Sequence, residues 1–319
     1  MNISTTKKEL QRAFSKLIKT TQARSQNPLI NYTYISSGAH GVTLHSTDLE
    51  VGIKTTITAS VNTDGEGLFP TTELNDIISV IDEGRVDIEI AGPHINIKSE
   101  KGTSFDIPTL PFQEYPKVPE NKHEIIYNIN TSELKKILDV IIYAINKDQL
   151  KPALSGALFS FSEEGLNFVS TDGHRLVVVA KKNESNIIED FIIPKKYLNM
   201  LSSFIQGQKE SSLIFSNNHI FINNDGDILY SRLIDEKYPN YSAVIPQDNS
   251  YVLKLQKEDF LNSIKATFIA TNKNTNQISL NLALGEVFLK SVNQPESKTV
   301  HAPLKTAEYN GEKISIGFN

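Results

Sequence analysis

The chain has 319 residues, a formal net charge of −5 and no cysteine, which excludes disulfides, thiolate metal sites and a cysteine nucleophile. Its 39% hydrophobic and 22% charged residues are typical of a soluble globular protein with room for two or three domains. The negative charge argues against a general nucleic-acid binder, so any basic surface has to be local.

Targeting and metal signals are missing from the sequence. The seven histidines show no paired metal spacing, and the polar N-terminus has no signal-peptide core. The longest apolar run, Ile137 to Ile145, is interrupted by Asp139 and is too short to span a bilayer. We therefore expect no metal, no membrane association and a cytoplasmic location.

The chain begins with an amphipathic pattern. Leu10, Phe14, Leu17 and Ile18 recur on one face of a predicted helix, and Thr6 stands three residues before Glu9, the spacing of a capping box. Alternating strands follow. Residues 69–74 then end a strand and open a second helix, three more strands come after it, and the proline-rich residues 108–119 are typical of a linker.

The same order then starts again. A helix is predicted to open at 132–138, with Ser132 as its polar cap residue, and strands follow. The run 166–180 predicts a strand, a tight Asp-Gly turn and a second strand. Residues 191–198 repeat the step from strand into helix, and 233–246 form a second linker.

A third round begins with a helix near Phe260, continues with strands at 278–284 and 287–291, and stops at 314–318. The registers agree: Leu10 to Leu134 is 124 residues, and Leu134 to Phe260 is 126. Such a period is far longer than that of solenoid repeats. We predict an α+β protein of three repeated domains, 1–119, 120–247 and 248–319, each with two helices packed on antiparallel sheets. The third ends where the others begin their second helix, so we expect it to be incomplete.

Enzyme chemistry has little support. Asp172 and His174 suggest acid–base catalysis, and Ser132 and Lys135 have SxxK spacing, but no other nucleophile motif accompanies them. The chain has no phosphate loop and no dinucleotide fingerprint. We expect no catalytic activity and no cofactor.

Several strings resemble those of the bacterial DNA polymerase III beta subunit, the sliding clamp. These are TDGHRL at 171–176, LIDEKYPNY at 233–241, TLP through YP at 109–116, and the tail IGFN at 316–319. Archaeal and eukaryotic clamps share the fold with two domains per chain, so three repeats favour the bacterial type. The resemblance implies the DNA clamp fold and a ring of six domains built from two chains joined head to tail.

The resemblance also implies partners. The ring would encircle double-stranded DNA without reading its sequence, confer processivity on the catalytic subunit of DNA polymerase III, and be placed on DNA by a clamp loader, in the cytoplasm at the nucleoid. Basic helix faces would meet phosphates. The candidate DNA-facing residues are Arg12, Lys16, Arg24, Lys135, Lys136, Lys147, Lys195 and Lys196. The alternative interpretation of these residues is a solvated helix face.

A groove for short peptides from polymerases, the clamp loader and repair proteins is the second implied site. Its residues, carried over one at a time, are Leu154, Thr171, Gly173, His174, Arg175, Leu176, Pro239 and Val244. The apolar members would accept Leu and Phe side chains, and the polar turn would bond the peptide backbone. The alternative for His174 and Arg175 is a turn that only holds its domain together.

For the contact between the two chains, Phe105, Ile107, Phe268 and Ile269 are candidates, with core packing as the alternative for each. A repeat-built interaction scaffold that never touches DNA remains a rival to the clamp. Salt-dependent affinity for duplex DNA separates the two, because only the clamp would have it.

Overall fold

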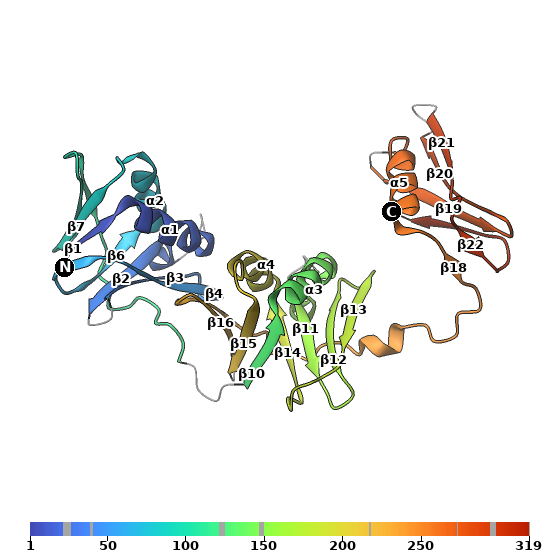
Figure 1. Ribbon diagram of the computed structural model, residues 1–319, viewed down its shortest axis with the longest axis horizontal. Helices are drawn as coiled ribbons and strands as arrows, with labels where there is room; N and C mark the ends of the chain where they lie inside the picture. The colour runs from blue at the N-terminus through green and yellow to red at the C-terminus, as the bar shows by residue number, and fades with distance from the viewer. Residues whose placement is uncertain are drawn as a thin grey trace. The chain divides into compact units, whose positions relative to one another are not determined.

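The computed structural model describes residues 1–21, 27–38, 41–120, 125–146, 150–216, 218–272, 274–293 and 298–318. Figure 1 traces the chain, which divides into two compact units, Met1–Pro239 and Asn240–Asn319. The predicted boundaries at 119 and 247 remain predictions. In the described part of the chain, no helix is long and apolar enough to cross a membrane.

In its described residues, the first repeat contains two helices and nine strands. They are β1 (Asn2–Thr6), α1 (Lys7–Leu17), β2 (Tyr32–Gly38), β3 (Gly41–Thr47), β4 (Val51–Ile57), β5 (Ser60–Thr63), β6 (Glu66–Pro70), α2 (Thr71–Val80), β7 (Arg85–Ala91), β8 (His94–Ser99) and β9 (Ser104–Pro108), with short 3₁₀ turns at Ile18–Thr20 and Pro28–Asn31. The predicted helical face is confirmed, because Leu10, Phe14 and Leu17 are fully buried.

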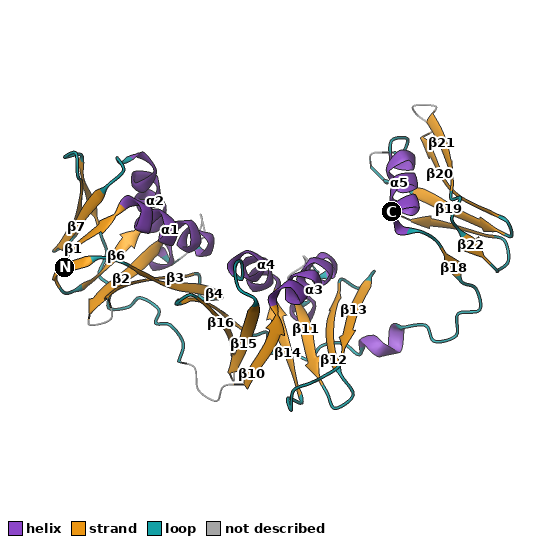
Figure 2. Cartoon of the chain, viewed as in Figure 1, coloured by secondary structure: helices purple, strands orange, loops and turns teal. Residues whose placement is uncertain are grey.

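The second repeat has the same layout, with helices on one side of antiparallel strands (Figure 2). Its elements are β10 (Ile125–Asn130), α3 (Thr131–Ala144), a 3₁₀ turn (Pro152–Ser155), β11 (Gly156–Phe161), β12 (Leu166–Thr171), β13 (Leu176–Lys181), β14 (Glu189–Pro194), α4 (Lys195–Phe204), β15 (Glu210–Ser216), β16 (His219–Asn224) and β17 (Asp227–Arg232). The helices pack in pairs, α1 with α2 and α3 with α4.

The second unit carries a smaller core, formed where α5 packs on its sheet. Its elements are a 3₁₀ turn (Tyr241–Val244), β18 (Leu253–Lys254), α5 (Lys257–Phe268), β19 (Ile278–Ala283), β20 (Glu286–Asn293), β21 (Lys298–Pro303), β22 (Glu308–Tyr309) and β23 (Ile314–Phe318).

The repeat recurs in the strand order. The orders β4-β3-β2-β6, β13-β12-β11-β14 and β21-β20-β19-β23 are equivalent, and so are β1-β7-β8-β9 and β10-β15-β16-β17. Strand β23 thus takes the place of β6 and β14, the strands that lead into α2 and α4. The α+β architecture with repeated antiparallel sheets that the sequence predicts is confirmed.

One sheet runs through both repeats of the first unit. Strand β17 pairs antiparallel with β4, which joins two four-stranded halves into an eight-stranded sheet. Behind this joint, the Tyr230 hydroxyl is hydrogen-bonded to His45 Nε2 at 2.7 Å, and both residues are buried. The Tyr230 ring lies so close to Gly52 that a Cβ there would be 2.2 Å from it. A side chain at residue 52 would therefore force this ring or the strand to move.

One helix start differs from the sequence prediction, and another agrees with it. The N-cap of α3 is Asn130, whose Oδ1 accepts from the backbone N–H groups of Ser132 and Glu133. The prediction of Ser132 as cap was wrong by two residues, because Asn at the end of β10 offers the acceptor first. At α1 the Thr6 hydroxyl accepts from Glu9 N–H at 3.2 Å, as in a capping box.

Candidate nucleic-acid and peptide interfaces

Helices α1 and α4, which come from different repeats, lie side by side. Lys19 Nζ donates to Ser203 Oγ at 3.3 Å, and Lys16 Nζ lies 5.9 Å from the centre of the Phe204 ring. A cavity of about 320 Å³ opens between the two helices. The joint between β17 and β4 therefore places basic residues of both repeats on one helical surface, which is where the sequence predicts DNA-facing residues.

Two of the predicted DNA-facing cations share one carboxylate. Asp227, at the start of β17, is bound by Lys16 Nζ and by Arg12 Nη1, the latter at 3.4 Å. Arg12 Nη2 also donates to the Thr56 carbonyl at 2.5 Å. These side chains are therefore not the simple solvated face that the alternative interpretation describes, since they bind across the two repeats.

The paired lysines at the start of α4 are also engaged. Lys195 Nζ donates to the Ile145 carbonyl at 2.9 Å, and Lys196 Nζ binds the buried carboxylate of Asp48. Burial lowers the pKa of Lys196. The Lys196 ion pair links α4 to the turn between β3 and β4, and therefore joins the two repeats a second time.

Lys135 and Lys136 of α3 differ from the others. Lys136 is exposed and Lys135 is half-buried, and neither has an ion pair with another described residue. Arg24 and Lys147 lie outside the described residues. Of the predicted cations that the structure describes, the α3 pair carries the charge that is most available to an incoming phosphate.

The predicted peptide site begins with the turn between β12 and β13. Asp172 Oδ1 accepts from the backbone N–H groups of His174 and Arg175, each at 3.0 Å, and Asp172 Oδ2 accepts from Arg175 Nε at 2.8 Å. Although burial acts to raise it, these hydrogen bonds hold the pKa of Asp172 well below its usual range. Thr171 Oγ1 donates to the Arg175 carbonyl, and Gly173 has φ +90°. Strand, turn and strand are as predicted.

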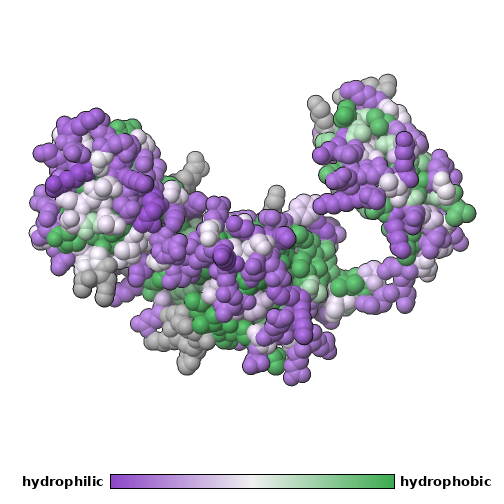
Figure 3. All heavy atoms as spheres, in the orientation of Figure 1, coloured by the Kyte–Doolittle hydropathy of each residue, from purple (hydrophilic) through white to green (hydrophobic). Residues whose placement is uncertain are grey.

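Arg175 also has a partner outside the turn. Its guanidinium carbon lies 4.3 Å from the centre of the Tyr143 ring on α3, and Tyr143 is 68% exposed. Leu176 then begins β13, an edge strand with Val178 partly exposed. Figure 3 shows an apolar patch over this part of the molecule.

The structure does not bring every predicted groove residue to the surface. Leu154 is only 7% exposed, whereas Pro239, His174 and Arg175 are exposed. Val244 is 69% exposed and belongs to the second unit. The first unit thus presents a polar turn, an open strand edge and an exposed proline, whereas Leu154 is buried.

The candidates for the contact between chains differ in how far they are buried. Ile107 of the edge strand β9 is buried in the core, as the core-packing alternative has it, and Phe105 is half-buried. Phe268 and Ile269 are 53% and 78% exposed at the end of α5. Core packing is therefore wrong for these two residues.

Sequence reasoning left out three residues of these surfaces. Tyr143 was recognisable as an aromatic residue on the polar side of a helix, and Asp172 belongs to the turn motif itself. Asp227 follows an Asp-Gly pair, but nothing local connects it to a helix 211 residues earlier. Among the described residues, no group of three His, Asp or Glu side chains could hold a metal ion.

Comparison with known proteins gives one family. Residues 1–119 match the family described as the N-terminal domain of the DNA polymerase III beta subunit, and residues 128–240 match its central domain. The beta sliding clamp of Rickettsia bellii is 28% identical over 302 residues, covering 86% of this chain and 76% of that protein. The beta sliding clamp of Pseudomonas putida is 24% identical over 303 residues, covering 93% of this chain and 82% of that protein.

Solved structures share the fold. The sliding clamp of C. crescentus superposes with a TM-score of 0.92 at 22% identity, covering all of this chain and 87% of that one. The DNA polymerase sliding clamp of Bacillus subtilis superposes with a TM-score of 0.91 at 22% identity, with the same coverage of both chains.

Proposed function

The chain belongs to the DNA polymerase III beta subunit family, and we propose that two copies of it close head to tail into a ring that encircles duplex DNA. The single observation that supports this most is the edge-to-edge pairing of β17 with β4, because it shows how one repeat joins the next. If the same type of contact joins each repeat to the next, within a chain and between chains, the assembly closes into a ring.

The free strand edges fit this proposal. By position in the repeat, β9 corresponds to β17, and β21 corresponds to β4. Both are edge strands in the described sheets, and an exposed edge is a template for pairing with another chain. We therefore propose that β9 of one copy pairs with β21 of the other, with Phe105 near Phe268 and Ile269 and with Ile107 in the core behind the contact.

Encircled DNA would pass along the helices. Lys135 and Lys136 would contact phosphates directly, and α1 and α4 would add weaker contacts. Such contacts carry no sequence information, as a sliding protein requires. The chain would act as a processivity factor without catalytic activity of its own, held on DNA by its topology and placed there by a clamp loader.

Partner peptides would dock at the turn between β12 and β13. The exposed turn, the open edge of β13 and Pro239 offer backbone hydrogen bonds beside apolar surface. We propose this as the site for the polymerase III catalytic subunit, the clamp loader, other polymerases and repair proteins.

Retention on DNA tests the ring. The protein is loaded on a nicked circular plasmid with a clamp loader and ATP, and its dissociation is followed before and after the plasmid is cut once. We expect rapid loss from the linear form only. Equal retention on both forms would contradict encirclement. The control variant Phe268→Asp with Ile269→Asp changes exposed residues, so it should fold but fail to dimerise or to be retained.

The peptide site has its own test. A peptide with the Gln-Leu-x-Leu-Phe type of clamp-binding motif is titrated into labelled protein and followed by NMR. Saturable shifts centred on residues 171–176 and Pro239 are expected, and Arg175→Ala with Leu176→Ala should abolish them. Shifts of equal size in that variant would show that the peptide binds elsewhere.

A further inference from the structure

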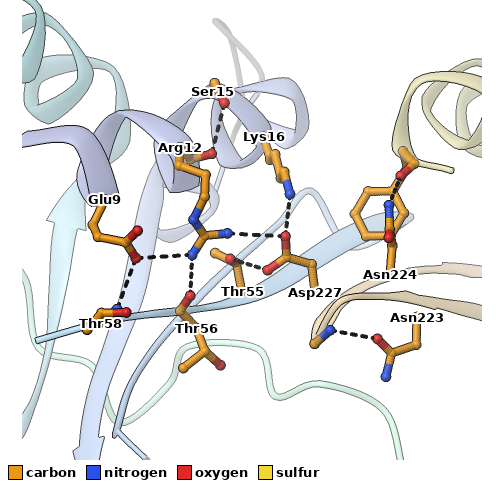
Figure 4. Close-up of polar contacts among 12 residues, drawn as sticks. Glu9, Arg12, Ser15, Lys16, Thr55, Thr56, Thr58, Asn223, Asn224 and Asp227 are labelled. Carbon is orange, nitrogen blue, oxygen red and sulfur yellow. Dashed lines mark hydrogen bonds and ion pairs between the residues drawn. The ribbon is translucent and has the colours of Figure 1, made fainter. Parts of the chain in front are cut away.

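Asp227 is a buried carboxylate at the joint between the first two repeats. Its side chain is 4% exposed, and its Oδ2 is bound by Lys16 Nζ and Arg12 Nη1 of α1 (Figure 4). Its other oxygen, Oδ1, accepts from the hydroxyl of Thr55 on β4. Strand β17 pairs with β4 directly beside it, so the backbone fixes where this negative charge lies.

A second carboxylate completes the cluster. Arg12 Nη2 lies 3.5 Å from Glu9 Oε2, and Glu9 is itself held by the backbone N–H of Thr58 at 3.0 Å. Glu9, Arg12, Lys16 and Asp227 therefore sum to no net formal charge. Arg12 and Lys16 nevertheless keep 39% and 33% of their side chains exposed, so an anion in solvent can reach them.

This arrangement has a consequence for DNA, and it rests on the proposed function. A phosphate that passes α1 must compete with Asp227 for the same two cations. The carboxylate cannot move away, because its strand and Thr55 hold it, and a charge in a poorly solvated site interacts more strongly than one in water. Each cation that stays bound to Asp227 contributes less to the release of counterions from DNA.

We infer that Asp227 is a positioning residue that withholds part of the positive charge of α1 from DNA. Its ion pairs keep Arg12 and Lys16 in place along the path of the duplex while reducing the number of phosphates that they neutralise. Contacts of this kind hold DNA weakly, which suits a protein that must slide. Lys135 and Lys136 of α3, which have no ion pair with another described residue, carry no such restraint.

The alternative is that Asp227 only ties the two repeats together. Under either interpretation, removing the Asp227 carboxylate lowers the stability of the protein. A stability measurement therefore does not distinguish the two roles. The slope of log affinity against log salt does, because it counts the phosphates neutralised, at about 0.9 per contact on duplex DNA. A purely structural ion pair leaves that slope unchanged.

The experiment measures binding of a short linear duplex at several salt concentrations by fluorescence anisotropy, for the full chain, for Asp227→Asn and for Asp225→Asn. Asp225 is the matched control, because it lies two residues away on an exposed turn, its loss changes the net charge equally, and it has no ion pair with Arg12 or Lys16. We expect Asp227→Asn to bind more tightly, with a slope steeper by about 1 to 2. Asp225→Asn should keep the slope of the unmodified chain.

A further variant keeps the test valid if Asp227→Asn does not fold. Arg12→Gln, Lys16→Gln and Asp227→Asn together replace the charged groups by amides that can still hydrogen-bond. We expect this variant to have a slope shallower than the unmodified chain by about 0.9 or less, because Asp227 already neutralises one cation. A decrease of about 1.8 would show that both cations are free for DNA and would overturn the inference.

The remaining outcomes separate the two proposals. If the unmodified chain binds duplex with a clear salt dependence but Asp227→Asn and Asp225→Asn have equal slopes, only the role of Asp227 is overturned. If the unmodified chain shows no salt-dependent affinity for duplex, the proposed clamp function fails, and the role of Asp227 fails with it.

Discussion

Leu49 and Gly173 occupy the same position in two equivalent turns, 124 residues apart, and both have positive φ, 76° and 90°. In each turn a threonine hydroxyl accepts from the backbone N–H of this residue at 3.0 Å. In each, the aspartate before it accepts from the next two backbone N–H groups. The repeat is therefore conserved down to individual hydrogen bonds, but one copy places a leucine where the other has glycine.

Replacing the glycine should show what this conformation costs a residue with a side chain. A Cβ at Gly173 meets nothing within 4 Å, so Gly173→Ala is destabilised only by its backbone conformation, by about 1 kcal/mol. Leu49→Gly removes the same strain, but glycine loses about 0.5–1 kcal/mol of conformational entropy. Leu49 is 59% exposed, so little burial is lost. We expect Leu49→Gly to be neutral or up to about 1 kcal/mol more stable.

Urea unfolding of both variants at pH 7 checks this pair. The two substitutions should shift the midpoint in opposite directions, or Leu49→Gly should leave it unchanged while Gly173→Ala lowers it. A Gly173→Ala variant as stable as the unmodified chain would mean that the turn relaxes to negative φ.

In each repeat, the hydroxyl of a buried serine donates to a carbonyl near the C-terminal end of the first helix. Ser46 Oγ donates to the Leu17 carbonyl at 3.1 Å, Ser170 Oγ to the Ile141 carbonyl at 2.7 Å, and Ser291 Oγ to the Thr267 carbonyl at 2.8 Å. Carbonyl groups near the end of a helix lack an intrahelical partner, so the hydroxyl satisfies them.

Ser170→Ala leaves a buried carbonyl without its donor and should lower the free energy of unfolding by about 1–3 kcal/mol. Ser155→Ala is a suitable control, because Ser155 is half-buried and its hydroxyl bonds only within its own short turn. Comparing the urea midpoints of the two variants tests the assignment. Equal midpoints would show that another group replaces the serine hydroxyl.

Much of the fold was predictable because it rests on short-range pattern. The helical face of Leu10, Phe14 and Leu17 follows from spacing alone, and the turn at 171–175 follows from its Thr, Asp and Gly residues. The 124-residue offset came from comparing such patterns along the chain. Each of these features involves residues that are neighbours in sequence, so local physics determines them.

The details of the candidate site were not predictable for the opposite reason. The sequence placed Arg12 and Lys16 on a basic face, but their carboxylate partner comes from a strand more than 200 residues later. The sequence around Lys196 likewise gives no sign of its ion pair, because its partner Asp48 lies in a turn of the other repeat. A basic residue has the same local pattern whether it faces solvent, DNA or an acid from another repeat. The pairing of β17 with β4 determines which of these surroundings Arg12, Lys16 and Lys196 have.

That joint gives a sharp prediction at Gly52. Gly52→Ala places a Cβ 2.2 Å from the Tyr230 ring, so the ring or the strand must move. Overpacking of this kind typically lowers stability by about 1–3 kcal/mol. Gly38→Ala is the control, because it lies in strand β2 of the same sheet and a Cβ there meets nothing within 4 Å. Thermal unfolding should show a large decrease for Gly52→Ala and little change for Gly38→Ala.

A comparable decrease in the two glycine variants would point to a general effect of alanine in these strands. In that case the close contact with Tyr230 would not explain the glycine, and the rigidity of the joint would need another cause.

The same joint should make stability depend on pH through His45. Burial, together with the nearby charge of Lys54, lowers the pKa of His45 from 6.5 to about 4. The unfolded chain takes up a proton below pH 6.5, whereas the folded chain does so only below about pH 4. The stability from neutral His45 is therefore complete above pH 6.5 and is lost as the pH falls toward 4. At pH 5 the loss is about 2 kcal/mol, at 1.36 kcal/mol per pKa unit.

Comparison with His45→Gln isolates this effect, because the amide can hydrogen-bond to Tyr230 but does not titrate in this range. The free energy of unfolding is measured in urea at pH 7.5, 6 and 5 for both proteins. The difference between them should change by about 2 kcal/mol in favour of the variant as the pH falls, while all other titrating groups cancel. A constant difference would mean that His45 is protonated in the folded chain at pH 5, which the buried contact with Tyr230 and the nearby Lys54 oppose.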